Sequence, residues 1–252
     1  MNIRSITAPN PGPFTLDGTR TWLLGHSVVL DPGPAIDSHV DAIRAAQPGL
    51  DTIFITHRHA DHAPAALALQ QATGARIIAP RGVLDGHRDV EVVGGEVFEL
   101  ASGSLEVIAT PGHTVEHVCF LTSDGGLFTG DTILGHGTTA IFPPDGDMAD
   151  YLRSLHRLRA RAPTRIFPGH GPTRDDAMAV IDHYIAHRLE REQQILATLA
   201  KGPNSIAGLR TAIYPELDRR LTDAAEIQLL AHLLKLETDG QVKREREEWA
   251  LA

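Results

Sequence analysis

The sequence predicts an α/β fold followed by a smaller, mainly helical domain. Through the first two thirds of the chain, short runs of β-branched and aromatic residues alternate with helix-forming segments. Several of these runs end at a turn that carries histidine or aspartate, which is where sites lie in layered α/β folds. After Pro172 the composition changes to long helix-forming segments. With 252 residues and 42% hydrophobic content, the chain can bury one large core with a small one beside it.

The expected elements of the larger domain follow from hydrophobic period and turn signals. Strands are predicted at residues 21–25, 27–31, 51–55, 76–80, 96–100, 105–110, 118–122, 126–129 and 165–167. Helices are predicted at 40–46, 65–71 and 150–161, with loops at 86–95 and 132–147. Ser102-Gly103 and Asp124-Gly125 are the expected turns between paired strands.

The densest group of ligand-type side chains lies between the strand at 51–55 and the helix at 65–71. His57, His59, Asp61 and His62 all fall within residues 57–62. Imidazole and carboxylate together suit zinc or a similar divalent ion, and these side chains converge only if the loop is tight. The alternative is an ordinary polar surface loop. We prefer a metal-binding loop, because a surface loop does not require such a density of ligands directly after a buried strand.

Three later motifs have the same construction. Residues 110–114 carry His113, residues 128–131 carry Asp131, and residues 167–171 carry His170. Each motif ends an apolar run and turns at a glycine, so its polar side chain projects from the end of a strand.

His57-x-His59-x-Asp61-His62, followed by these three motifs in this order, resembles the signature of the metallo-β-lactamase superfamily. The resemblance implies a four-layer αββα sandwich over residues 1–175 and a centre with two divalent metal ions, for which Zn²⁺ is the expected identity. The implied metal ligands are His57, His59, Asp61, His62, His113, Asp131 and His170.

The resemblance also implies how the ligands divide and what they do. One ion is held by His57, His59 and His113, and the other by Asp61, His62 and His170, with Asp131 between them. The implied reaction is hydrolysis by a hydroxide shared between the two ions. Asp61 and Asp131 are the expected catalytic residues, and Asp61 orients the hydroxide or accepts a proton.

Residues 176–252 are predicted to form the second domain. Helices are expected at 175–201, 206–213 and 224–238, the last two capped by Ser205 and by Thr222 or Asp223, with a β-wing at 241–244. The expected apolar stripes are Ile181, Ile185, Leu189, Ile195, Leu196 and Leu199 in the first helix, and Ile227, Leu230, Leu233, Leu234 and Leu236 in the third. This arrangement is that of a winged helix. Acidic and basic side chains nearly balance over residues 188–252, unlike in a DNA-reading winged helix. We therefore expect it to pack on the sandwich or on a partner subunit, as in a homodimer.

The substrate is less determined than the reaction. The tail and the loop at 135–139 resemble the endoribonuclease-like branch of the superfamily, the β-lactamase-like protein 2 group, so single-stranded RNA is one expected substrate. The alternative is a small ester, thioester or lactone, because hydroxyacylglutathione-hydrolase-like members share the ligands. Their tail is helical and basic, however. A non-enzymatic binding scaffold is disfavoured because the ligand set is complete.

Composition excludes several other classes. The net charge of −9 opposes non-specific binding to nucleic acid, and no double-stranded DNA is expected as a partner. No apolar run approaches the roughly 20 residues that span a bilayer, and the first residues do not resemble a secretion signal. The single cysteine, Cys119, falls in a predicted buried strand and is expected to be inert. A cytoplasmic, membrane-free location fits these features.

Some polar residues keep two interpretations. Asp31 either orients the metal loop or caps a turn, and His117 either supports the ligands or lines the sandwich. His136 lies in the predicted active-site loop and is a weaker candidate for substrate contact. The remaining histidines are expected on the surface or in helices: His26, His39, His87, His156, His183, His187 and His232.

Overall fold

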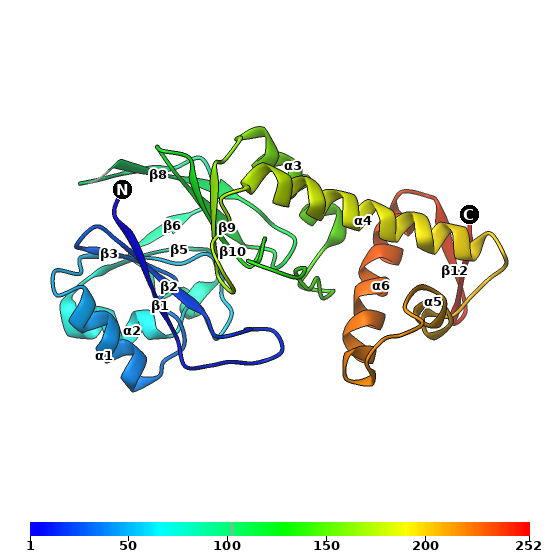
Figure 1. Ribbon diagram of the computed structural model, residues 1–252, viewed down its shortest axis with the longest axis horizontal. Coiled ribbons are helices and arrows are strands. Elements are labelled where there is room, and N and C mark those ends of the chain that lie inside the picture. Colours follow the sequence, from blue (N-terminus) through cyan, green and yellow to red (C-terminus); the bar gives the residue numbers. More distant parts are fainter. Residues whose placement is uncertain (102) are drawn as a thin grey trace.

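Two β-sheets pack face to face in the N-terminal part of the molecule (Figure 1). The computed structural model describes residues 1–101 and 103–252, so the predicted turn residue Ser102 lies outside the described part. The first sheet has six strands in chain order: β1 (Ile3–Thr7), β2 (Arg20–Leu24), β3 (Val28–Leu30), β4 (Thr52–Phe54), β5 (Arg76–Pro80) and β6 (Val90–Val92). The second has five strands, ordered β11-β10-β9-β8-β7: β7 (Val97–Leu100), β8 (Gly103–Ala109), β9 (Val118–Thr122), β10 (Gly126–Gly130) and β11 (Arg165–Pro168).

Helices cover the outer face of each sheet. The first sheet is covered by α1 (Asp37–Ala46) and α2 (Ala65–Thr73), and the second by α3 (Met148–Ala160) and α4 (Ala177–Leu199). Successive side chains along a strand point to opposite faces of the sheet, so they belong to different cores. In β2, Leu23 joins the core beneath α1 and α2, whereas Trp22 and Leu24 join the core between the sheets. The four layers confirm the predicted αββα sandwich.

Cys119 shows the same alternation in the second sheet. Its side chain is fully buried in the core beneath α3 and α4, while its neighbour Phe120 points between the sheets. Burial raises the pKa of the Cys119 thiol to about 12. The predicted burial of Cys119 is therefore confirmed.

The C-terminal part has a core of its own. It comprises α5 (Ile206–Ile213), the 3-10 helix η2 (Arg219–Leu221), α6 (Thr222–Thr238) and the antiparallel pair β12 (Val242–Glu245) and β13 (Glu248–Leu251). Figure 1 shows α4 running from the sandwich into this part, so one helix belongs to both cores. The helices and the β-wing confirm the predicted winged-helix arrangement. In the described part of the chain, no helix has both the length and the apolar composition needed to cross a membrane.

The helix caps in this part were only partly predictable. Ser205 caps α5 as expected, because its hydroxyl accepts a hydrogen bond from the Gly208 amide at 3.1 Å. The predicted cap of α6 by Thr222 or Asp223 is wrong. That helix continues directly from η2, and its first position follows Leu221 with no side-chain cap.

Several other details differ from the prediction. The edge strands β1 and β6 were missed, because a short edge strand carries little apolar pattern. Leu189 was expected inside but is 42% exposed, since it lies between the part of α4 that covers the sandwich and the part that enters the C-terminal core. In α6, Leu233 and Leu236 are buried as predicted. Ile227 and Leu234 were expected inside but are exposed, because the buried face of the helix includes Leu229 instead.

Candidate metal centre

All seven predicted site residues meet where the strand-end loops of the two sheets converge. The loop after β4 supplies His57, His59, Asp61 and His62, and the loop after β8 supplies His113. Asp131 directly follows β10, and His170 follows β11. The prediction that these motifs would lie at strand ends is confirmed in each case.

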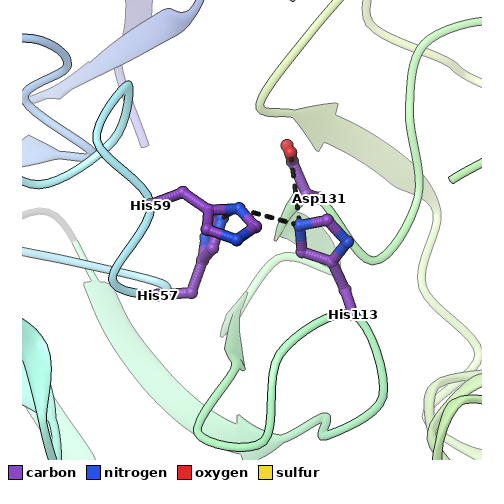
Figure 2. A group of neighbouring side chains, drawn as sticks. All are labelled: His57, His59, His113 and Asp131. Atoms are coloured by element: carbon purple, nitrogen blue, oxygen red, sulfur yellow. Dashed lines mark hydrogen bonds and ion pairs between the residues drawn. The ribbon is translucent and has the colours of Figure 1, made fainter. Parts of the chain in front are cut away.

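The first of two groups contains His57, His59, His113 and Asp131, whose ligand atoms lie within 4.8 Å of one another (Figure 2). His59 Nδ1 is 3.0 Å from His57 Nε2 and 3.1 Å from His113 Nε2. Asp131 Oδ2 is 3.6 Å from His113 Nε2. Three imidazole nitrogens and one carboxylate oxygen therefore face a common point.

The second group contains Asp61, His62 and His170, again with ligand atoms within 4.8 Å of one another. His62 Nε2 is 3.3 Å from His170 Nε2, and Asp61 Oδ2 is 3.2 Å from His170 Nε2. Asp131 reaches this group too, because its Oδ1 is 3.3 Å from both of these Nε2 atoms. The two oxygens of Asp131 thus face different groups.

The donors fit divalent metal ions. Imidazole nitrogen and carboxylate oxygen are the ligands that zinc accepts, and the two groups together present them at two adjacent points. Asp131 Oδ1 is buried and faces His62 Nε2 and His170 Nε2 at 3.3 Å, but it makes no well-aligned hydrogen bond among the described residues. A cation between these atoms would give the buried carboxylate oxygen a closer partner.

The carboxylates of the site raise the pKa of two of its histidines. Burial opposes the charged form of His170, but the Asp131 carboxylate outweighs it and the pKa of His170 rises to about 9. The pKa of His62 is likewise raised, because the carboxylates of Asp131, Asp31 and Asp61 outweigh its burial. Burial lowers the pKa of His57, which stays neutral and keeps a free lone pair.

Hydrogen bonds at the far side of the rings orient the ligand atoms. His62 Nδ1 donates to Asp31 Oδ2 at 3.0 Å, and His113 Nδ1 donates to the Ala140 carbonyl at 2.9 Å. His170 Nδ1 faces the Gly18 carbonyl at 3.4 Å. Because each Nδ1 is directed at an acceptor, each Nε2 is left to face the site.

Asp31 and His117, for which the sequence allowed two roles, both contact the predicted ligands. Asp31 is buried and accepts hydrogen bonds from His62 Nδ1 at 3.0 Å and from the Thr56 amide and hydroxyl at 2.8 Å each. It therefore orients the metal-binding loop. His117 is buried, stacks on the His57 ring at 4.8 Å between centroids, and accepts from the Asp131 amide at 3.2 Å.

One glycine in these motifs is required by close packing. A Cβ at Gly169 would lie 2.6 Å from His62 Cε1 and 2.7 Å from Asp131 Oδ1. Any larger residue there would push apart side chains of the site. Sequence reasoning missed Thr19, whose hydroxyl donates to Asp61 Oδ2 at 3.0 Å, because no pattern links residues 42 positions apart.

A cavity of about 610 Å³ opens beside the two groups and is bounded by both parts of the molecule. The sandwich lines it with Phe14, Leu16, His136, Thr139 and Phe142, among others. The C-terminal part contributes Tyr214, Leu217, Leu221, Ala224, Ala225 and Gln228. The lining is mainly apolar, and no lysine or arginine lines it in the described part of the chain.

Two family models match this chain, and both agree with the fold and the site. Residues 15–170 match the family model of the metallo-β-lactamase superfamily, and residues 205–249 match that of the β-lactamase-associated winged helix domain. The chain belongs to the metallo-β-lactamase superfamily and is a metal-dependent hydrolase with an appended winged helix.

Individual relatives are similar along most of their length. A "Beta-lactamase-like protein 2 homolog" of Drosophila melanogaster is 33% identical over 94% of this chain and 88% of its own. An "Atrochrysone carboxyl ACP thioesterase" of Aspergillus fumigatus is 29% identical over 94% of this chain and 81% of its own. The crystal structure of a β-lactamase domain protein from Burkholderia ambifaria superposes with a TM-score of 0.87, at 22% identity, over 99% of this chain and 91% of that one. That structure supports the fold.

Proposed function

We propose that this protein hydrolyses a small ester or thioester with an apolar acyl group, using two divalent metal ions, for which zinc is the expected identity. One observation carries the proposal: the cavity beside the two ligand groups is lined mainly by apolar side chains. Burying an acyl chain against such a wall stabilises the complex by about 0.8 kcal/mol per methylene group.

The proposed ligands of the first ion are His57, His59 and His113, and those of the second are Asp61, His62 and His170, with Asp131 shared. When bound, such a pair of ions supplies a nucleophile derived from water and polarises the bond to be broken. Asp61 is proposed to orient this nucleophile, because its carboxylate is partly exposed to the cavity and is held by the Thr19 hydroxyl.

The apolar wall has parts from both domains. Phe14 and Phe142 form an edge-to-face pair at 6.0 Å between centroids, and Leu217 and Leu221 line the same cavity from the C-terminal part. An acyl chain in this cavity would lie against these side chains, beside the two ligand groups. The similarity to an acyl carrier protein thioesterase supports a thioester as the class.

Single-stranded RNA is the second candidate substrate, favoured by the similarity to the β-lactamase-like protein 2 homologues over most of the chain. The charges near the cavity weigh against it. Arg58, on the ligand loop, is paired with Glu116 and Asp145, and phosphate contacts need free cations. We therefore expect RNA cleavage to be slow, insensitive to sequence and suppressed by salt.

Hydrolysis assays on the zinc-loaded protein test the proposal. The substrates are a series of acyl thioesters and aryl esters of increasing chain length, with single-stranded RNA assayed at low and high salt. We expect kcat/KM to rise with acyl length until the cavity is filled. Efficient RNA cleavage with no preference among acyl chains would favour the second candidate, and cleavage that survives Asp61→Ala would identify a contaminant.

A further inference from the structure

Three consecutive residues of the loop between β10 and α3 are each bonded to a different element. The Thr139 carbonyl accepts from the Arg188 guanidinium of α4. The Ala140 carbonyl accepts from His113 Nδ1 at 2.9 Å. The Ile141 amide donates to Gln228 Oε1 of α6 at 3.1 Å. The residue that contacts a proposed metal ligand is therefore held on one side by α4, the helix shared by both cores, and on the other by α6 of the C-terminal part.

The contact at Ala140 determines the state of His113. A carbonyl oxygen can only accept, so the Nδ1 that faces it must carry the ring proton. The neutral ring then has its lone pair on Nε2, the atom that faces His59 and Asp131. If the Ala140 carbonyl moved away, the hydrogen bond that favours the Nδ1–H tautomer would be lost.

Arg188 is an unusual residue to bury. Its side chain is 1% exposed, and no carboxylate lies within salt-bridge distance of it among the described residues. Burying an unpaired charge is costly. The guanidinium lies 5.2 Å from the centre of the Tyr151 ring and donates to the Thr139 carbonyl. The hydroxyl of Thr139 in turn donates to the Asp131 carbonyl at 2.8 Å. This buried cation thus holds the loop that supports Asp131.

Gln228 has a comparable place on α6. Its oxygen accepts the Ile141 amide, its Nε2 is buried without a partner among the described residues, and its side chain lines the cavity. The orientation of the amide is determined by the Ile141 N–H, which needs an acceptor.

We propose that Arg188 and Gln228 are positioning residues for His113. Helices α4 and α6 hold residues 139–141 so that the Ala140 carbonyl keeps the His113 proton on Nδ1 and its Nε2 lone pair directed into the site. The C-terminal domain thereby contributes to metal affinity although none of its residues belongs to the two ligand groups. Loss of the direct partner of a ligating histidine typically costs about 10- to 100-fold in metal affinity or activity, and loosening the Ala140 carbonyl acts on that partner.

A glutamine series at position 228 tests this. Gln228→Met has similar length but no acceptor, and Gln228→Glu keeps an oxygen for the Ile141 amide. Gln71→Met, on the exposed face of α2, is the matched control. Histidine ring ¹⁵N NMR of the metal-free proteins reports the His113 tautomer, and competition with a chelator reports zinc affinity. Melting curves establish that each variant is folded.

We expect only the Nδ1–H tautomer of His113 in the unchanged protein, in Gln228→Glu and in Gln71→Met. In Gln228→Met we expect a mixture of tautomers and roughly tenfold weaker zinc binding. Arg188→Met should act in the same direction if it folds. An unchanged His113 tautomer in folded Gln228→Met would overturn the inference. If Gln228→Met changes the His113 tautomer but the unchanged protein binds no zinc, Gln228 still positions His113, and the proposed metal centre is refuted instead.

Discussion

The sandwich and the C-terminal domain contribute different kinds of groups to one site. The sandwich supplies every member of the two ligand groups, each from a loop at the end of a strand. The C-terminal domain supplies apolar side chains that bound the cavity, and hydrogen bonds that hold the loop at residues 139–141. The two regions therefore differ in kind: strand ends of the sandwich present the ligand atoms, whereas the C-terminal helices close the cavity beside them and hold the loop that contacts His113.

The largest effect is expected from Asp131→Ala in the sandwich. Both oxygens of Asp131 face ligand groups, so its loss should reduce kcat by several orders of magnitude and zinc content from two ions toward one. Elemental analysis and ester hydrolysis measure the two effects. Two tightly bound ions in the variant would show that the carboxylate is not shared.

Removing the C-terminal side should also be severe. A chain ending after residue 175 lacks α4, whose Val180, Ile181, Tyr184 and Ile185 pack into the core of the second sheet. It also lacks the Tyr184 hydroxyl that accepts from the Leu134 amide at 3.0 Å. We expect aggregation and lost activity, measured by light scattering and hydrolysis. A soluble, fully active truncated protein would show that the predicted boundary at 175/176 separates independent units.

Zinc affinity should fall as the pH is lowered. The pKa of His170 is raised to about 9 because the Asp131 carboxylate outweighs the effect of burial. The ring therefore holds a proton below that pH, and metal must displace it. Zinc affinity should fall about tenfold per pH unit for each displaced proton as the pH drops below about 9. Chelator competition at several pH values, with proton release followed by a dye, provides the measurement. A pH-independent affinity would contradict this charge balance.

The smallest effect is expected at the cavity wall. Leu217→Ala should raise KM for a long acyl substrate by roughly 5- to 50-fold, with little change in kcat, because it removes apolar contact distant from the reacting atoms. A short acyl substrate is the internal control and should change much less. Equal losses for both substrates would mean that the C-terminal domain does not select the acyl group.

The local motifs of the sandwich could be predicted because their information is contiguous. Residues 57–62 carry four of the ligand-group members, and the other three each end an apolar run at a glycine turn. Strand ends, glycine turns and the Ser205 cap all depend on neighbours within a few positions. The four layers required the family resemblance as well, since hydrophobic period alone does not order the strands.

Tertiary structure alone determined the contacts that join the two domains. The bonds from Arg188 to Thr139 and from Gln228 to Ile141 span 49 and 87 positions, and no periodicity relates such residues. The exposure of Leu189 has the same origin, because a helix shared by two cores leaves a gap between them. A sequence states which side chains are apolar or polar, but the packing of α4 and α6 against the sandwich decides which of them face the cavity, the loop or the solvent.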